Sequence, residues 1–216
     1  FKTFGTSSIM IGDNATGTID AANYNTGLGV DIFAALTTGD NNIAVGFASL
    51  TALTTGSQNT AVGESSMAAI TSGQGNTAVG SKSLDAGTTA NDNTAIGYKA
   101  LTTNTEGHYN VAVGKDALEM ATTADSNTAV GFKALEANTT GAANTAVGAN
   151  ALDANTTGGS NIAIGKDAVT ANTSGAGNIG IGVGALRANT TAGEVTGVGD
   201  GCLAANTSGA LNTAFG

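Results

Sequence analysis

The five residues Asn144-Thr145-Ala146-Val147-Gly148 return, with small variations, every 17 residues along the chain. When the asparagine is taken as position 1, thirteen copies fall on one register without insertion or deletion. The copies start at residues 8, 25, 42, 59, 76, 93, 110, 127, 144, 161, 178, 195 and 212. Self-similarity at a fixed period is typical of repeat architectures, so a 17-residue repeat decides the fold.

The register predicts one continuous domain over residues 8–216. We interpret residues 1–7 as part of a preceding coil, residues 8–24 as a degenerate repeat, and residues 212–216 as an incomplete one. The chain starts at Phe1 instead of a methionine and stops after five positions of a repeat. We therefore expect it to be a portion of a longer polypeptide.

The composition excludes several classes of protein. The chain has 216 residues, a net charge of −9 and no proline, and 11% of its residues are charged, against about 25% in an ordinary domain. Its many Val, Ile and Thr residues fit pleated surfaces and favour a small repetitive core over disorder. The acidic balance argues against nucleic acid as a partner. No apolar run approaches the ~20 residues that span a membrane, so we expect no membrane insertion of this segment.

Each position of the repeat has its own chemistry. Position 5 is glycine in all thirteen copies, which indicates a positive φ or a close approach of two backbones. Position 4 is always apolar, position 9 is an apolar anchor such as Leu135, and charges gather at positions 6, 7, 10, 16 and 17. This pattern predicts a short strand over positions 2–4, a turn at glycine, a second short segment, and a turn at Thr-Thr-Gly. We expect the second segment, for example 134–137, to be a strand, with one helical turn as the alternative.

The period selects a solenoid. Seventeen residues are too few for a helical hairpin repeat, and regular Gly, Asn and Thr disfavour helix. The sequence predicts an all-β fold, a parallel β-solenoid of about twelve 17-residue coils in which strands stack at about 4.8 Å.

The position-1 asparagines are predicted to form a hydrogen-bonded ladder, as asparagines do in cross-β stacks. The alternative role for them is turn formation. The predicted ladder comprises Asn42, Asn59, Asn76, Asn93, Asn110, Asn127, Asn144, Asn161 and Asn178.

Alternation along the strand predicts which residues face inward. We expect positions 2 and 4, which carry Thr, Val and Ile, to fill the coil, and positions 3 and 5, which carry Ala and Gly, to face out. An outward face of Ala and Gly suits close approach of another chain, so we expect a parallel homotrimer that associates through it. The alternative is a monomeric solenoid with Ala and Gly packed inward.

The phrase Asn-Thr-Ala-Val-Gly-x-x-Ala-Leu, at 127–135 and 144–152, resembles the head repeats of trimeric autotransporter adhesins and the repeats of phage tail fibres. The resemblance covers residues 8–216. It implies a left-handed parallel β-roll with three chains side by side. It also implies an extracellular location, on a cell surface or a virion fibre.

No catalytic constellation, cofactor site or metal site is predicted. His108 is expected to decorate the surface, and Cys202 to pack against the coil as a small residue. Asn-x-Ser/Thr sequons share position 12 in the C-terminal half, and one more lies at Asn14; they indicate either glycosylation or turn chemistry. The position-12 sequons are Asn138, Asn155, Asn172, Asn189 and Asn206.

The predicted function is that of a rigid spacer or fibre-forming rod in an extracellular or virion surface fibre or adhesin. Its predicted partner is another copy of the chain, in a homotrimer or an end-to-end filament. An ice-binding solenoid is one alternative, although Thr at position 2 is interchanged with Ile and Val. Binding of a cell-surface glycan or receptor through Phe47, Tyr98 and Phe132 is another.

Overall fold

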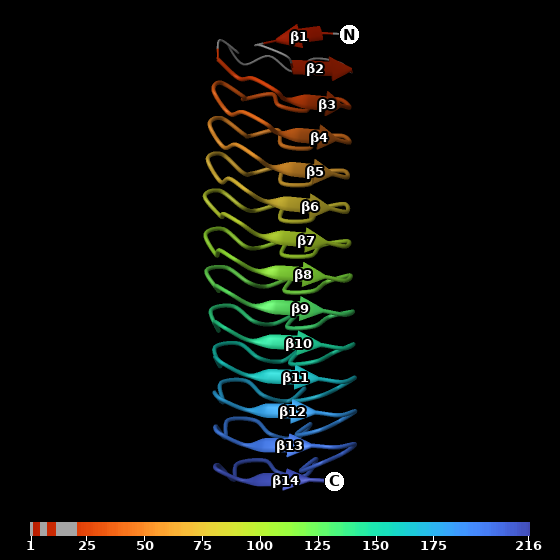
Figure 1. Ribbon diagram of the computed structural model, residues 1–216, viewed down its shortest axis with the longest axis vertical. Coiled ribbons are helices and arrows are strands. Elements are labelled where there is room, and N and C mark those ends of the chain that lie inside the picture. Colours follow the sequence, from red (N-terminus) through yellow and green to blue (C-terminus); the bar gives the residue numbers. More distant parts are fainter. Residues whose placement is uncertain (1, 5–7, 12–20) are drawn as a thin grey trace.

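In the computed structural model, which describes residues 2–4, 8–11 and 21–216, the chain winds into a rod whose strands stack in one column (Figure 1). Fourteen strands follow one another in sequence order through a single sheet. Each strand from β2 to β13 pairs in parallel with the strand 17 residues further along, as Thr128 does with Thr145 and Ala129 with Ala146. The predicted parallel β-solenoid of 17-residue coils is therefore confirmed.

Each coil contributes one short strand, which occupies positions 2–4 from β3 onward. The strands are β1 (Lys2–Phe4), β2 (Ser8–Ile11), β3 (Thr26–Leu28), β4 (Ile43–Val45), β5 (Thr60–Val62), β6 (Thr77–Val79), β7 (Thr94–Ile96), β8 (Val111–Val113), β9 (Thr128–Val130), β10 (Thr145–Val147), β11 (Ile162–Ile164), β12 (Ile179–Ile181), β13 (Thr196–Val198) and β14 (Thr213–Phe215). β1 runs antiparallel to β2, so its residues cover the edge of β2. β1 therefore does not continue the parallel stack that the later strands form.

The glycine at position 5 meets both predicted requirements. Gly148 has a φ of 138°, and a Cβ placed on it would lie 2.5 Å from the carbonyl oxygen of Gly165 in the next coil. No side chain fits at that distance. The glycine column therefore fixes how closely successive coils approach.

The segment after the glycine is a series of turns, so the prediction of a second strand at 134–137 is wrong. Lys133 and Leu135 adopt left-handed conformations, with φ of 57° and 54°. Such a conformation costs about 1–2 kcal/mol for a residue with a side chain. It directs Leu135 into the coil, where full burial contributes about 1.5–3 kcal/mol and offsets the cost. The Leu135 N–H donates to the carbonyl of Ala151 in the next coil at 3.0 Å.

The core is thin and consists of small residues facing an apolar anchor. Ala146 at position 3, Ala151 at position 8 and Leu152 at position 9 are fully buried, whereas Val147 at position 4 is 37% exposed. The prediction that Val and Ile fill the coil while Ala faces out is therefore wrong. The predicted association through an outward face of Ala is wrong with it, because the position-3 alanines pack inward as the alternative had them. The strand does alternate between an inward and an outward side chain, but with the opposite phase to the predicted one, and a shift of one residue exchanges the two faces of a strand. A 17-residue coil has room for only a small strand residue opposite the leucine.

Candidate interaction surfaces

The position-1 asparagines form a ladder inside the coil. The Asn144 backbone N–H donates to Asn127 Oδ1 at 2.9 Å, and Asn144 Nδ2 donates to the same oxygen at 3.1 Å and to the Gly158 carbonyl at 2.9 Å. The same three bonds recur at Asn42, Asn59, Asn76, Asn93, Asn110, Asn127 and Asn161. These side chains are buried, so they join coils to one another and present nothing to a ligand.

The sequon asparagines at position 12 form a second internal ladder. Asn138, Asn155, Asn172 and Asn189 are fully buried. Asn155 Nδ2 donates to Asn138 Oδ1 at 2.8 Å and to the Gly158 carbonyl at 2.9 Å. A sugar on that nitrogen would remove these bonds and has no room inside the coil.

The interpretation of the four buried sequons as glycosylation sites is therefore wrong for the folded coil. Asn206 is half-buried, and its Nδ2 also donates inward, to the Gly209 carbonyl at 2.9 Å. Asn14 lies outside the described residues.

The outward surface of the sheet is made by positions 2 and 4 of β3 to β14, and we call it the sheet face. Over these strands the two positions hold only Thr, Val, Ile, Leu and Phe. Ile43, Ile96 and Ile164 are 41%, 39% and 40% exposed. Long exposed surfaces without charge are uncommon on monomers and mark interaction sites. The sheet face is therefore the strongest candidate for an interface.

One sequence signal does locate the sheet face. In the copies from residue 25 onward, position 3 is never larger than alanine, whereas position 4 accepts Leu28, Val45 and even Phe215. A restriction on size marks a packed interior, and free exchange among residues of different size marks a surface. The usual rule that larger apolar residues point inward hid this signal.

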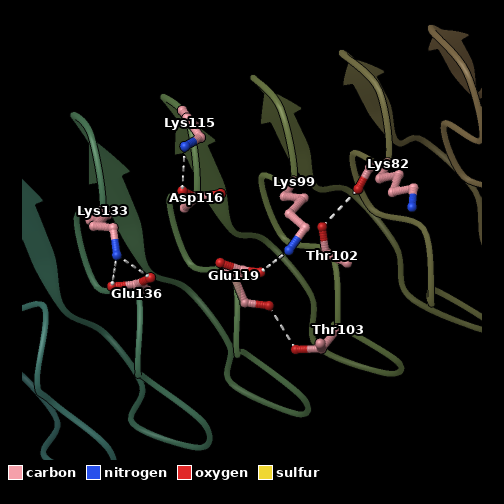
Figure 2. A network of polar contacts seen from close by, with 9 residues as sticks. All are labelled: Lys82, Lys99, Thr102, Thr103, Lys115, Asp116, Glu119, Lys133 and Glu136. Atoms are coloured by element: carbon pink, nitrogen blue, oxygen red, sulfur yellow. Dashed lines mark hydrogen bonds and ion pairs between the residues drawn. The ribbon is translucent and has the colours of Figure 1, made fainter.

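A corner of the rod next to the sheet face carries ion pairs (Figure 2). Lys99 Nζ lies 2.8 Å from Glu119 Oε1, and Lys133 Nζ lies 2.8 Å from Glu136 Oε1. The hydrogen bond and negative charge of Glu119 raise the pKa of Lys99. A hydrogen bond from Lys133 to Glu136 likewise raises the pKa of Lys133.

Three carboxylates gather at this corner. Oxygen atoms of Asp116, Glu119 and Glu136 lie within 4.8 Å of one another, and Asp116 is only 6% exposed. Lys115 Nζ lies 3.4 Å from Asp116 Oδ2, so each carboxylate has a lysine beside it. Because the positive and negative charges balance, we interpret the corner as an ion-pair network and assign it no metal.

The same lysines make cation–π contacts with two of the aromatic rings predicted to bind a glycan, Tyr98 and Phe132. Lys115 Nζ lies between two rings, 5.9 Å from the centroid of Tyr98 and 5.6 Å from that of Phe132. Lys99 and Lys133 lie at similar distances from Tyr98 and Phe132 respectively. These are cation–π distances. Tyr98 and Phe132 therefore have cationic partners within the chain. Phe47, the third ring predicted to bind a glycan, is 55% exposed.

His108 and Cys202 both take part in bonds between coils. The Asn91 N–H donates to His108 Nδ1 at 3.0 Å, and the His108 N–H donates to Asp125 Oδ1 at 2.7 Å. His108 is therefore more than surface decoration. Cys202 Sγ donates to the Ala214 carbonyl at 3.3 Å, as Ser49 Oγ does to Ala61, and packs against the coil as predicted.

The fold and these surfaces define a β-solenoid repeat protein whose coils are joined by internal ladders and whose sheet carries an uncharged outer face. No family model, curated protein or solved structure matches the chain. Among the residues described, no helix is long and apolar enough to cross a membrane.

Proposed function

We propose that the chain is a rigid segment of an extracellular or virion surface fibre or adhesin, and that it associates with copies of itself as a homotrimer. The observation that carries this proposal is the sheet face, which runs from β3 to β14 without a charged residue. Burial of such a surface contributes about 25 cal/mol for each Å² of apolar area removed from water. A second copy offers an equally long and equally regular surface.

The repeat supports the spacer role. From residue 25 onward, each coil bonds to its neighbours through strands and turns, and most coils also through asparagine side chains. We therefore expect this part of the rod to be stiff. A stiff stack of this kind holds whatever is attached at its two ends at a fixed distance. No charged residue lies on the sheet face of β3 to β14, which leaves this face free for association.

Native mass tests the proposal. Sedimentation equilibrium of the chain is expected to give three times its 20.7 kDa at micromolar concentration. The double variant Val130→Lys/Val147→Lys adds two ammonium groups to adjacent strands of the sheet face and is expected to be monomeric. The matched control Ala142→Lys/Ala143→Lys adds the same charge at two exposed positions away from the sheet face and is expected to keep the assembly. A monomeric wild-type chain would overturn the proposal.

A second candidate function is ice binding, and one observation favours it. The threonines at position 2 point outward beside the Val and Ile column, as in the successive strands β5, β6 and β7, and they lie on a regular sheet instead of at a turn. Such a surface presents hydroxyl and methyl groups at a constant spacing. Thermal hysteresis of the monomeric fraction separates the two candidates, because an ice-binding face must stay uncovered. Freezing and melting points that coincide would remove ice binding.

A further inference from the structure

A surface cavity of about 380 Å³ lies where the chain enters β5, β6, β7 and β8. Positions 16 and 17 of four successive coils build it, and the strands that follow them are neighbours in the column (Figure 1). Because successive coils are about 4.8 Å apart, the cavity runs along the rod for about 14 Å. Its lining residues are Gln58, Gln74, Gly75, Asn91, Asp92, His108 and Tyr109.

The solenoid does not require polar side chains at these two positions. In the three coils of residues 127–177, positions 16 and 17 are alanine or glycine except at Ser160. Those coils nevertheless keep the same parallel pairing in the same register. Among the described residues, the side chains of Gln58, Gln74 and Asp92 make no hydrogen bond or ion pair with the protein. Folding therefore does not account for the chemistry of this cavity.

Bonds between coils hold two of the lining side chains in place. The Gln74 N–H donates to Asn91 Oδ1 at 2.8 Å, and the Asn91 N–H donates to His108 Nδ1 at 3.0 Å. Because Nδ1 accepts this bond, the neutral imidazole carries its hydrogen on Nε2. The Asn91 amide has two N–H groups, and its Nδ2 lies 3.5 Å from the same ring nitrogen, so at least one N–H stays available. Donors that are already fixed lower the entropic cost of binding a ligand.

The charge and shape of the lining select a class of ligand. Asp92 is the only Asp, Glu, Lys or Arg in it, and no lysine or arginine occupies position 16 or 17 of any repeat. An anion would therefore find no positive partner here. Tyr109 is 63% exposed and offers an apolar ring beside groups that both donate and accept hydrogen bonds. Sugars present hydroxyl groups and an apolar C–H face, and they match this combination.

We propose that the cavity binds a neutral oligosaccharide that lies along the rod axis. The amides, the Asp92 carboxylate and His108 Nε2 bond to its hydroxyl groups, and Tyr109 packs against one sugar ring. Tyr98 and Phe132 follow their strands, whereas the cavity precedes its strands, so this site is separate from the cation–π corner. The proposal does not rest on the fibre role.

Isothermal titration of the full chain with neutral tetrasaccharides of glucose, galactose, mannose and N-acetylglucosamine tests the proposal. At least one of them is expected to bind with a dissociation constant of about 1 mM. The constant is expected to change less than ~2-fold between roughly 0.1 and 1 M NaCl, because no ion pair forms. Binding of none of these sugars, or binding that high salt abolishes, would overturn the proposal. Tighter binding of tetramethylammonium than of every sugar would also overturn it, since the site would then be one for cations.

Three variants locate the bound sugar. Tyr109→Ala is expected to weaken binding at least ~10-fold, because the ring contact is lost. Gln74→Ala removes a side chain without bonds inside the chain and is expected to weaken binding about 3-fold at an unchanged urea midpoint. The matched control Tyr24→Ala removes another position-17 tyrosine, 58% exposed and outside the cavity, and is expected to bind within ~2-fold of the wild type. Equal losses for the two tyrosine variants, or no loss for Tyr109→Ala, would overturn the assignment of the site.

Discussion

The coils of residues 42–75 and those of residues 127–177 follow one backbone path but fill its interior in opposite ways. In the first region position 8 is serine and position 12 is apolar, as with Ser49 and Leu53. In the second region position 8 is alanine and position 12 is asparagine, as with Ala151 and Asn155. All four side chains are fully buried.

The comparison shows that position 12 accepts either apolar or polar side chains. What the coil requires is that residues at the same position in successive coils pack on or bond to one another. Position 12 holds Leu53 and Ile70 in successive coils of the first region, and an asparagine ladder in the second. Between the two regions lie Asn104 and two small residues, Gly87 and Ala121. Asn104 bonds within its own coil, to the N–H and carbonyl of Gly107, so the change of chemistry leaves no stranded group there.

The largest expected effect concerns a feature that the two regions share. Gly63→Ala and Gly148→Ala each place a Cβ 2.5–2.6 Å from the backbone of the next coil, at φ of 136° and 138°. We expect each to lose roughly 3–6 kcal/mol of unfolding free energy, and the two losses to be equal within ~1 kcal/mol. Urea unfolding followed by circular dichroism measures both.

Gly87→Ala is the control for these variants, because its Cβ would meet only ordinary contacts at 3.4 Å or more. Its stability is expected to match or exceed that of the wild type. A wild-type urea midpoint for Gly148→Ala would contradict the proposed spacing role of the glycine column.

Leu53→Asn imposes the second region's chemistry on the first. The amide can bond within its own coil, as Asn104 does, so the expected loss of about 2–4 kcal/mol comes from the buried leucine that is removed. Leu53→Ala is the matched comparison and is expected to be no less destabilising. If Leu53→Asn were much worse than Leu53→Ala, own-coil bonding would not operate in the first region.

Asn155→Leu is the reciprocal change. It leaves Asn138 Oδ1 without the donor it now has at 2.8 Å, and we expect a loss of about 1–3 kcal/mol. The triple variant Asn138→Leu/Asn155→Leu/Asn172→Leu is expected to lose less for each substitution, since the leucines then stack on one another. A triple loss three times the single loss would mean that neighbours along the column do not matter.

The smallest expected effect lies at position 16. In the N-terminal half the Gln74 N–H donates to Asn91 Oδ1 of the next coil at 2.8 Å. The next-coil residue facing the Gly159 N–H is Ala176, which has no acceptor, so Ala176→Asn is expected to add about 0.5 kcal/mol of stability. Ala176→Leu is the control without an acceptor, and the gain is read from the difference between their urea midpoints.

The repeat predicts the period, the strand at positions 2–4 and the need for glycine at position 5, because each depends on residues close in sequence. The phase of the strand depends on how much room the closed coil leaves, which is a property of the whole loop. The second segment was predicted as a strand because residue propensities do not show that burial can stabilise a leucine, such as Leu135, in a left-handed conformation. The sequons wrongly indicated glycosylation because Asn-Thr-Thr is also the sequence of a buried asparagine amide followed by a turn.

The register between coils has a consequence for how such a rod changes length. Thr128, Thr145 and Ile162 stand in line on successive strands, and among the described strands each contacts only those next to it in the sheet. An in-frame duplication or loss of one 17-codon unit therefore lengthens or shortens the rod by one step and keeps every residue on its original side. The length of the rod can therefore change in units of one coil without altering which residues lie on the sheet face.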